Sequence, residues 1–176
     1  MGLKSIESII ELMVDVPDFP KPGILFKDIT PVLGNHEAFV SLARQFYRSL
    51  EKPEEVSKIV AIEARGFILG AALAQHINAG LVLVRKPGKL PRERLSHTYD
   101  LEYGTDTLEI HKEDISPGDK VIIIDDVLAT GGTAKATCDM CKKLGAEILG
   151  LHVLLEIEAL KGREKIDVPL HVLAKC

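Results

Sequence analysis

Apolar residues gather in short uninterrupted runs along the chain, and the run Val121–Ile124 is the most uniform of them. All four of its residues are β-branched, and it follows the turn-forming sequence Pro117-Gly118-Asp119. A strand with one face in water would alternate apolar and polar residues, so this run predicts a central strand that is buried on both faces. Further strands are predicted at Ile59–Ile62, Leu81–Val84, Leu108–Ile110, Ile148–Leu155 and Leu170–Leu173.

Stretches with helical patterning separate most of these runs. Helices are predicted at Ile6–Val14, Glu37–Leu50, Phe67–Ile77 and Ala134–Leu144, and Asn35 is the expected cap of the second. The proline-containing segment from Pro17 to Leu33 predicts irregular structure, and a polar loop is expected after Val84. Strands that alternate with helices are typical of an α/β fold, in which helices flank a parallel sheet. A chain of 176 residues with 46% hydrophobic content is most simply one domain, residues 1–176.

A candidate anion site follows the strand at Val121–Ile124, since ligands bind where such strands end. The residues Ala129, Thr130, Gly131, Gly132 and Thr133 lead into the predicted helix Ala134–Leu144. The first amides of a helix are unpaired and carry the positive end of its dipole, so a phosphate fits there. Glycines let the backbone approach the ligand closely, and the two threonine hydroxyls can donate to phosphate oxygens.

Asp125 and Asp126 stand between this strand and the phosphate loop. Their charges would repel a phosphate unless they held a pair of hydroxyls or a divalent cation between them. A ribose diol meets that need, because two adjacent hydroxyls can donate charge-assisted hydrogen bonds to carboxylates. A nucleotide triphosphate loop would place a lysine here, and the sequence has no such motif. The alternative is a plain strand-turn-helix with solvated aspartates at its tip.

The overall charge favours a small-molecule partner. A net charge of −4 argues against a general nucleic-acid or membrane surface. Acidic residues interrupt Ile6–Val14, so that stretch predicts an amphipathic helix rather than a signal peptide, and no apolar run approaches membrane-spanning length. We therefore expect a cytoplasmic protein with no nucleic-acid or membrane partner. Cys138 and Cys141 fall inside a predicted helix and are expected to pack against the sheet.

Several motifs carry a resemblance to a known family. The run from Val121 to Thr133 resembles the 5-phosphoribosyl 1-pyrophosphate (PRPP) signature of the type I phosphoribosyltransferases, and the likeness to the adenine branch of that family spans nearly the whole chain. The further matching segments are Asp18–Pro31, Glu63–Phe67, Arg85–Pro91, Tyr99–Gly104 and Leu160–Glu164. The resemblance implies a small N-terminal hood over the base site at residues 17–33, a mobile lid at 86–103 and a homodimer. It also implies a cis or strongly distorted Glu63–Ala64 peptide.

The segment Arg85–Arg94 concentrates basic residues in an acidic chain, which suggests a polyanion. With the family in view, we expect Arg65, Lys86 and Lys89 to bind pyrophosphate ahead of Arg92 and Arg94. The resemblance adds Tyr103 to this group. It further implies that Mg²⁺ is held mainly by PRPP, with no direct protein ligand.

Base recognition rests mainly on the resemblance. It implies that Leu25 reads adenine through its main-chain N–H and C=O, with Lys27 beside it. It also points to Glu102 and Arg65 as catalytic residues, and leaves open whether Glu102 is a general acid or base or only positions the purine. The predicted reaction is adenine plus PRPP giving AMP plus pyrophosphate. The alternatives are transfer to hypoxanthine, guanine, xanthine or orotate, or a PRPP-sensing regulator without catalysis.

Overall fold

The computed structural model describes residues 3–100 and 104–176. Its contacts divide the chain into two compact units, Met1–Arg48 and Ser49–Cys176. The prediction of one domain over residues 1–176 stays a prediction. Among the described residues, no helix is long and apolar enough to cross a membrane.

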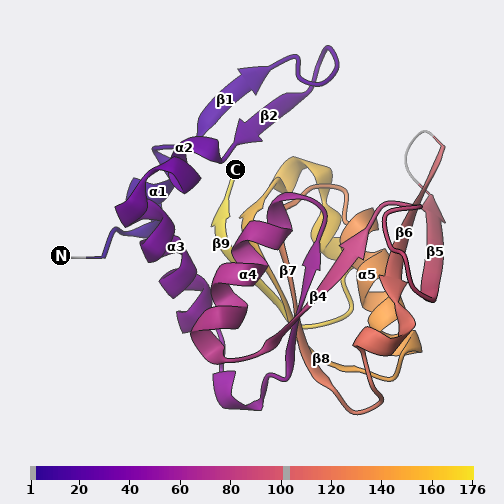
Figure 1. Cartoon of the computed structure of the whole chain (residues 1–176). Coiled ribbons are helices and arrows are strands. Elements are labelled where there is room, and N and C mark those ends of the chain that lie inside the picture. Colours follow the sequence, from indigo (N-terminus) through magenta and orange to yellow (C-terminus); the bar gives the residue numbers. More distant parts are fainter. Residues whose placement is uncertain (1–2, 101–103) are drawn as a thin grey trace. The chain divides into compact units, whose positions relative to one another are not determined.

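The first unit joins three helices to a β-hairpin, which is labelled β1 and β2 in Figure 1. Its elements are α1 (Ile6–Ile10), β1 (Val14–Pro17), β2 (Leu25–Asp28), α2 (Thr30–Gly34) and α3 (His36–Arg48). β1 and β2 pair antiparallel, with Val14 opposite Asp28 and Pro17 opposite Leu25. Asn35 Oδ1 accepts a hydrogen bond from Ala38 N at 3.0 Å, which confirms the predicted cap of α3.

Two expectations for this unit were wrong. The first helix ends at Ile10, and Val14 already belongs to a strand. The segment from Pro17 to Leu33 is not irregular throughout, since it contains β2 and α2. Two of the prolines lie in the hairpin loop, where Asp18 and Gly23 have positive φ and the Asp18 carboxylate accepts from Gly23 N at 2.7 Å. Only Pro20 and Pro22 lie in this loop, since Pro17 is the last residue of β1 and Pro31 belongs to α2.

The second unit is a seven-stranded sheet of order β5-β6-β4-β3-β7-β8-β9. Its strands are β3 (Lys58–Ile62), β4 (Gly80–Arg85), β5 (Arg94–Asp100), β6 (Thr105–His111), β7 (Lys120–Leu128), β8 (Glu147–Glu156) and β9 (Leu170–Lys175). Five neighbouring strands of this order, β4, β3, β7, β8 and β9, pair in parallel, which confirms the predicted α/β class. The pairings of the other two strands are antiparallel, because β6 pairs antiparallel with both β4 and β5.

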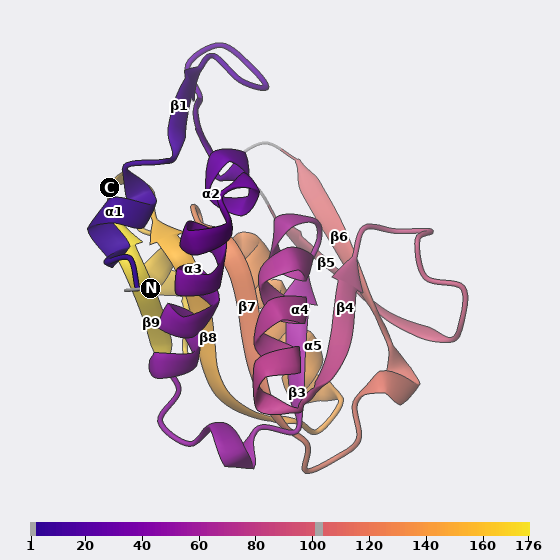
Figure 2. The ribbon, with the colours of Figure 1, turned by 60° about the vertical axis from the view of Figure 1, so that its left-hand side comes forward.

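Helices α4 (Arg65–Ile77) and α5 (Gly132–Lys143) cover opposite faces of this sheet, and Figure 2 shows α4 in front and α5 behind. The connection from β3 through α4 to β4 and the connection from β7 through α5 to β8 run in opposite directions along the sheet. Since such connections are right-handed, the two helices lie on opposite faces. Cys138 and Cys141 are buried on α5 within the core, as predicted. Burial raises the pKa of Cys138 to about 11 and that of Cys141 to about 12, so both thiols stay protonated and pack as apolar groups.

The polar loop expected after Val84 contains a strand that the sequence analysis missed. β5 alternates exposed and half-buried residues, and its half-buried members are Leu95, His97 and Tyr99. His97 and Tyr99 carry polar groups, so the sequence of β5 shows no clear alternation of apolar and polar residues. The neighbouring strand β6 is also longer than the predicted Leu108–Ile110.

Candidate active site

Three connecting segments begin at the carboxyl ends of the central strands β3, β4 and β7. In the parallel ladders Ile62 of β3 pairs with Val84 of β4, and Ala61 pairs with Ile124 of β7. The carboxyl ends of these strands therefore lie at the same edge of the sheet. Asp125 and Asp126 lie there in the last part of β7, and Arg65 and the basic loop follow β3 and β4, so the structure brings these predicted site residues together.

The predicted phosphate loop, residues 129–133, leads into α5, as its sequence position suggested, and its role stays a prediction. Gly131 caps the helix with φ 77°, a backbone conformation that favours glycine, and Gly132 is the first helical residue. The residues of the loop line a small cavity of about 80 Å³ together with Asp125, Val127, Leu128 and Val153. The hydroxyl of Thr133 lies 2.9 Å from that of Tyr99, so β5 contacts the loop directly.

The two aspartates sit beside Arg65. Asp126 is 5% exposed, and its Oδ2 lies 2.8 Å from Arg65 Nε. The contact is an ion pair, because Oδ2 receives no well-directed hydrogen bond. Asp125 Oδ1 accepts from Asp126 N at 2.9 Å. Desolvation and the adjacent Asp126 charge raise the pKa of Asp125 well above its usual value. Such a pair, with an unsatisfied buried oxygen, is suited to accept hydroxyl donors.

Glu63 connects the Arg65 turn to the basic loop, and the sequence analysis gave it no role of its own. Its Oε2 accepts from Lys86 N at 2.8 Å and from Arg85 Nε at 3.3 Å. The Glu63–Ala64 peptide is cis, which confirms the prediction for this bond. The Arg85 guanidinium also lies 5.7 Å from the centre of the Phe67 ring, on α4. The segment that follows β3 and the segment that follows β4 are thus tied together.

The basic residues of the loop contact acids on β6 and just after it. Lys86 Nζ forms an ion pair with Asp106, which also accepts from the Tyr99 hydroxyl at 3.1 Å. Arg92 pairs with Glu113 and Asp114, and Arg94 pairs with Glu109 at 3.0 Å. Ion pairs with acids are thus shared by Lys86, Arg92 and Arg94, and the predicted order of these residues as ligands stays a prediction. Asp106 and Tyr99 were missed because they lie in the strands hidden within polar sequence.

The predicted base-binding residues and Tyr103 do not belong to the described part of the second unit. Leu25 and Lys27 lie on β2 of the first unit, where Leu25 is 49% exposed and Lys27 Nζ pairs with Asp15 at 2.6 Å. Glu102 and Tyr103, and thus part of the predicted lid, lie outside the described residues.

Few protein atoms are available for a metal. Within residues 3–100 and 104–176, no three His, Cys, Asp or Glu side chains are grouped to hold an ion. Asp126 Oδ2 is the one buried side-chain oxygen without a directed hydrogen bond in the same part of the chain, and it forms the ion pair with Arg65. Mg²⁺ prefers oxygen ligands and commonly keeps several from water and substrate phosphates.

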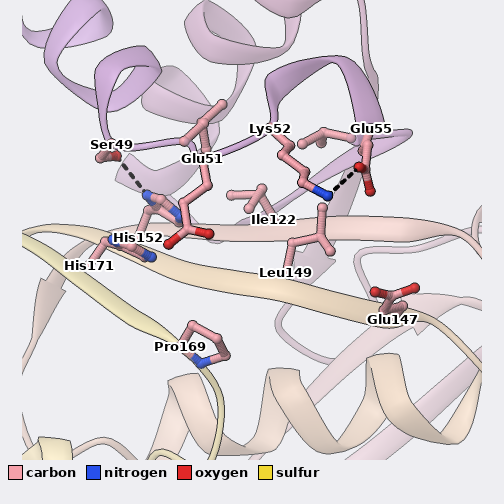
Figure 3. A pocket seen from close by; sticks show the side chains of 12 residues that line it. Ser49, Glu51, Lys52, Glu55, Ile122, Glu147, Leu149, His152, Pro169 and His171 are labelled. Carbon is pink, nitrogen blue, oxygen red and sulfur yellow. Dashed lines mark hydrogen bonds and ion pairs between the residues drawn. The ribbon is translucent and has the colours of Figure 1, made fainter.

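A second pocket, of about 240 Å³, lies toward the amino ends of β7 and β8 (Figure 3). The imidazole rings of His152 and His171 stack there with centroids 4.4 Å apart, and His152 Nδ1 lies 2.8 Å from Ser49 Oγ. Figure 3 shows the Glu51 carboxylate pointing toward the two rings. Burial, and secondarily His171, lowers the pKa of His152 to about 3, so this ring is neutral near pH 7.

This burial predicts acid sensitivity of the fold. Below the unfolded pKa of 6.5, the unfolded state binds a proton at His152 that the folded state does not. The free energy of unfolding should therefore fall as pH drops from about 6.5 toward 3, by about 2 kcal/mol at pH 5 from this residue. Urea unfolding at pH 7 and pH 5 measures the loss. It should be smaller in His152→Gln but unchanged in His76→Gln, at an exposed position; equal losses in all three proteins would contradict the assignment.

The comparisons with known proteins agree with this geometry. Residues 32–173 match the family described as the phosphoribosyl transferase domain, the class that the Asp125–Asp126 pair and its phosphate loop define. The chain is 54% identical to the adenine phosphoribosyltransferase of Halothermothrix orenii, over 87% of this chain and 89% of that protein. It is 53% identical to that of Carboxydothermus hydrogenoformans, over 86% and 89%.

Solved structures show the same fold. The adenine phosphoribosyltransferase of Thermoanaerobacter pseudethanolicus superimposes with a TM-score of 0.94 at 46% identity, covering 98% of this chain and 100% of that one. The Saccharomyces cerevisiae enzyme, solved with adenine and an imino-altritol bisphosphate, gives 0.92 at 40% identity, with coverage of 96% and 97%. The chain belongs to the adenine phosphoribosyltransferase family.

Proposed function

We propose that this chain transfers the 5-phosphoribosyl group of PRPP to adenine, which yields AMP and pyrophosphate. The observation that carries this proposal is the Asp125–Asp126 pair in the last part of β7, just before the loop that opens α5, in a member of the adenine branch. Adenine is present in the Saccharomyces cerevisiae structure and 9-deazaadenine in that of Giardia lamblia, both close in fold to this chain.

The sugar phosphate is held at two points. The backbone amides of Ala129, Thr130, Gly131, Gly132 and Thr133 receive the 5′-phosphate, supported by the positive end of the α5 dipole. Asp125 and Asp126 accept the ribose hydroxyls in charge-assisted hydrogen bonds. Two contacts support this assignment: Asp125 lines the cavity of the loop, and the ion pair with Arg65 fixes the carboxylate of the adjacent Asp126.

Loss of pyrophosphate leaves an oxocarbenium-like sugar, so the departing charge must be neutralised in place. Arg65, Lys86, Lys89 and Tyr103 are the proposed partners of pyrophosphate. The contact of Glu63 with Lys86 N supports their grouping, because it joins the turn of Arg65 to the basic loop. Mg²⁺, brought by PRPP, would add positive charge on the leaving group. The purine nitrogen then attacks the opposite face of the sugar.

The base is assigned to the first unit and the lid. Leu25 presents its main-chain N–H and C=O to adenine, Lys27 lies two residues on, and Glu102 positions the purine or moves its proton. Pro17 supports the role of Leu25: it stands opposite Leu25 in the hairpin and, having no N–H, cannot donate to the carbonyl of Leu25. We further propose that residues 86–103 close over PRPP as a lid.

A cytoplasmic homodimer is proposed as the working form. The net charge and the resemblance support it, as does the exposure of two large apolar side chains on neighbouring elements. These are Ile68 of α4, which is 42% exposed, and Leu81 of β4, which is 40% exposed.

Product analysis tests the function. Purified protein given adenine, PRPP and Mg²⁺ should form AMP and pyrophosphate in equal amounts. A metal chelator should abolish turnover, because uncompensated charge would remain on the leaving group. Binding of PRPP without turnover on adenine, other purines or orotate would overturn the proposal in favour of a PRPP sensor.

A further inference from the structure

The segment Leu160–Glu164 matches the family, yet the proposed chemistry gives it no task. In the structure it spans the junction of two short 3₁₀ helices, Glu158–Leu160 and Gly162–Lys165, which are separated by Lys161 alone. Lys161, at the centre, has the left-handed conformation with φ 53°. We call residues 160–164 the Gly162 turn.

The backbone of the Gly162 turn is packed against the phosphate loop. A Cβ atom added to Gly162 would lie 2.1 Å from Ala129 O and 2.9 Å from Gly131 N. A Cβ added to Gly131 would in turn lie 2.4 Å from Gly162 O. Both sets of neighbours are backbone atoms, which cannot move aside as a flexible side chain can. The two glycines therefore allow two backbone segments to touch directly at this point.

Two further contacts fix the turn at this place. Ile157 N donates to Leu128 O at 2.9 Å, one residue before the phosphate loop begins. Arg163 donates to both carboxylate oxygens of Glu156, from Nε at 2.9 Å and from a terminal nitrogen at 2.6 Å. Glu156 is only 3% exposed and pairs with Leu128 in the ladder between β8 and β7.

A bidentate pair between arginine and carboxylate fixes both distance and orientation. Because Glu156 belongs to β8, the guanidinium ties the turn to the sheet rather than to another loop. The Arg163 contact also lowers the pKa of Glu156, so the carboxylate remains ionised near pH 7. The turn thus has a rigid anchor on one side and the phosphate loop on the other.

We propose that the Gly162 turn, anchored by Arg163 and Glu156, is a positioning element that holds the phosphate loop in the shape that receives the 5′-phosphate. Arg163 and Gly162 act through Ala129 and Gly131 and touch no substrate. The inference rests on the proposed function, because it assumes that the loop binds the phosphate of the sugar. It predicts that the turn matters to the 5′-phosphate and not to the pyrophosphate, which is assigned to other segments.

Calorimetric titrations with ribose 5-phosphate and with magnesium pyrophosphate separate the two ends of the site. Gly162→Ala must displace Ala129 or Gly131, and a misplacement of about 1 Å can cost on the order of 100-fold in a positioned site. We expect ribose 5-phosphate to bind roughly 10- to 100-fold more weakly. Pyrophosphate affinity should stay within about twofold, as for an independent site.

Arg163→Lys gives a milder second variant if Gly162→Ala does not fold. It keeps the charge but loses the bidentate geometry, so ribose 5-phosphate should bind about 3- to 10-fold more weakly. Two matched controls should bind both ligands as the wild type does. Gly80→Ala meets only an ordinary contact, 3.5 Å from Lys58 Cγ. Glu158→Gln removes an exposed ion pair with Lys175 from the neighbouring 3₁₀ helix.

Each outcome decides between the two claims. Unchanged ribose 5-phosphate affinity in both turn variants would overturn the inference, as would an equal loss of both ligands in folded protein. Wild-type protein that binds ribose 5-phosphate but forms no AMP would overturn the proposed function and leave the turn's role intact. Wild-type protein that binds neither ligand would overturn both.

Discussion

Replacement of Asp126 by alanine should lower kcat/KM for PRPP about 10- to 150-fold, the equivalent of roughly 1.5–3 kcal/mol for a hydrogen bond to a charged group. Asp126 is nearly buried and pairs with Arg65, so its removal has two consequences. A ribose hydroxyl loses its charged acceptor, and the guanidinium that is assigned to pyrophosphate loses the partner that orients it. Both effects concern PRPP, so the KM for adenine should change little.

Steady-state kinetics with each substrate varied in turn measure this result. Asp139→Ala is the matched control, because it removes an aspartate that pairs with Lys135 on the surface of α5. The control should retain the PRPP kinetics of the wild type. If Asp126→Ala kept them too, with its thermal unfolding unchanged, the assignment of the diol to this carboxylate would be wrong.

Local sequence was sufficient to predict the strand, the loop and the helix that carry the centre of the candidate site. The β-branched run of β7, the two aspartates after it and the glycines that open α5 are contiguous, and each has a direct conformational meaning. The parallel order of the core strands could likewise be expected from their alternation with helices. Cys138 and Cys141 were assigned to the core from their place in a helix, and both are buried.

Features that depend on distant pairing could not be predicted in this way. β5 becomes a strand through its ladder with β6, because its own residues are largely polar. The contact of Lys86 with Asp106 joins residues that are 20 positions apart, and no pattern links them. Arg163 and Glu156 are near in sequence, but the positioning role proposed for them depends on the contact of Gly162 with Ala129, which only the structure reveals. The hairpin in the first unit was missed because its prolines suggested irregular structure.

Discrimination between bases should be the largest effect in this protein. Adenine donates from its exocyclic amine and accepts at a ring nitrogen, and we proposed that the main-chain N–H and C=O groups of Leu25 complement that order. A 6-oxopurine reverses it, so a donor would face a donor and buried groups would stay unpaired, at about 1–3 kcal/mol each. Sites built on hydrogen bonds reject such analogues strongly, and we expect a preference for adenine over hypoxanthine of at least ~100-fold in kcat/KM.

The most direct test of the account is therefore the initial rate of nucleotide formation by the purified chain, with PRPP and Mg²⁺ held constant and adenine or hypoxanthine varied. The account predicts AMP from adenine and at least ~100-fold lower kcat/KM with hypoxanthine. Equal rates with the two bases would contradict the assignment of adenine.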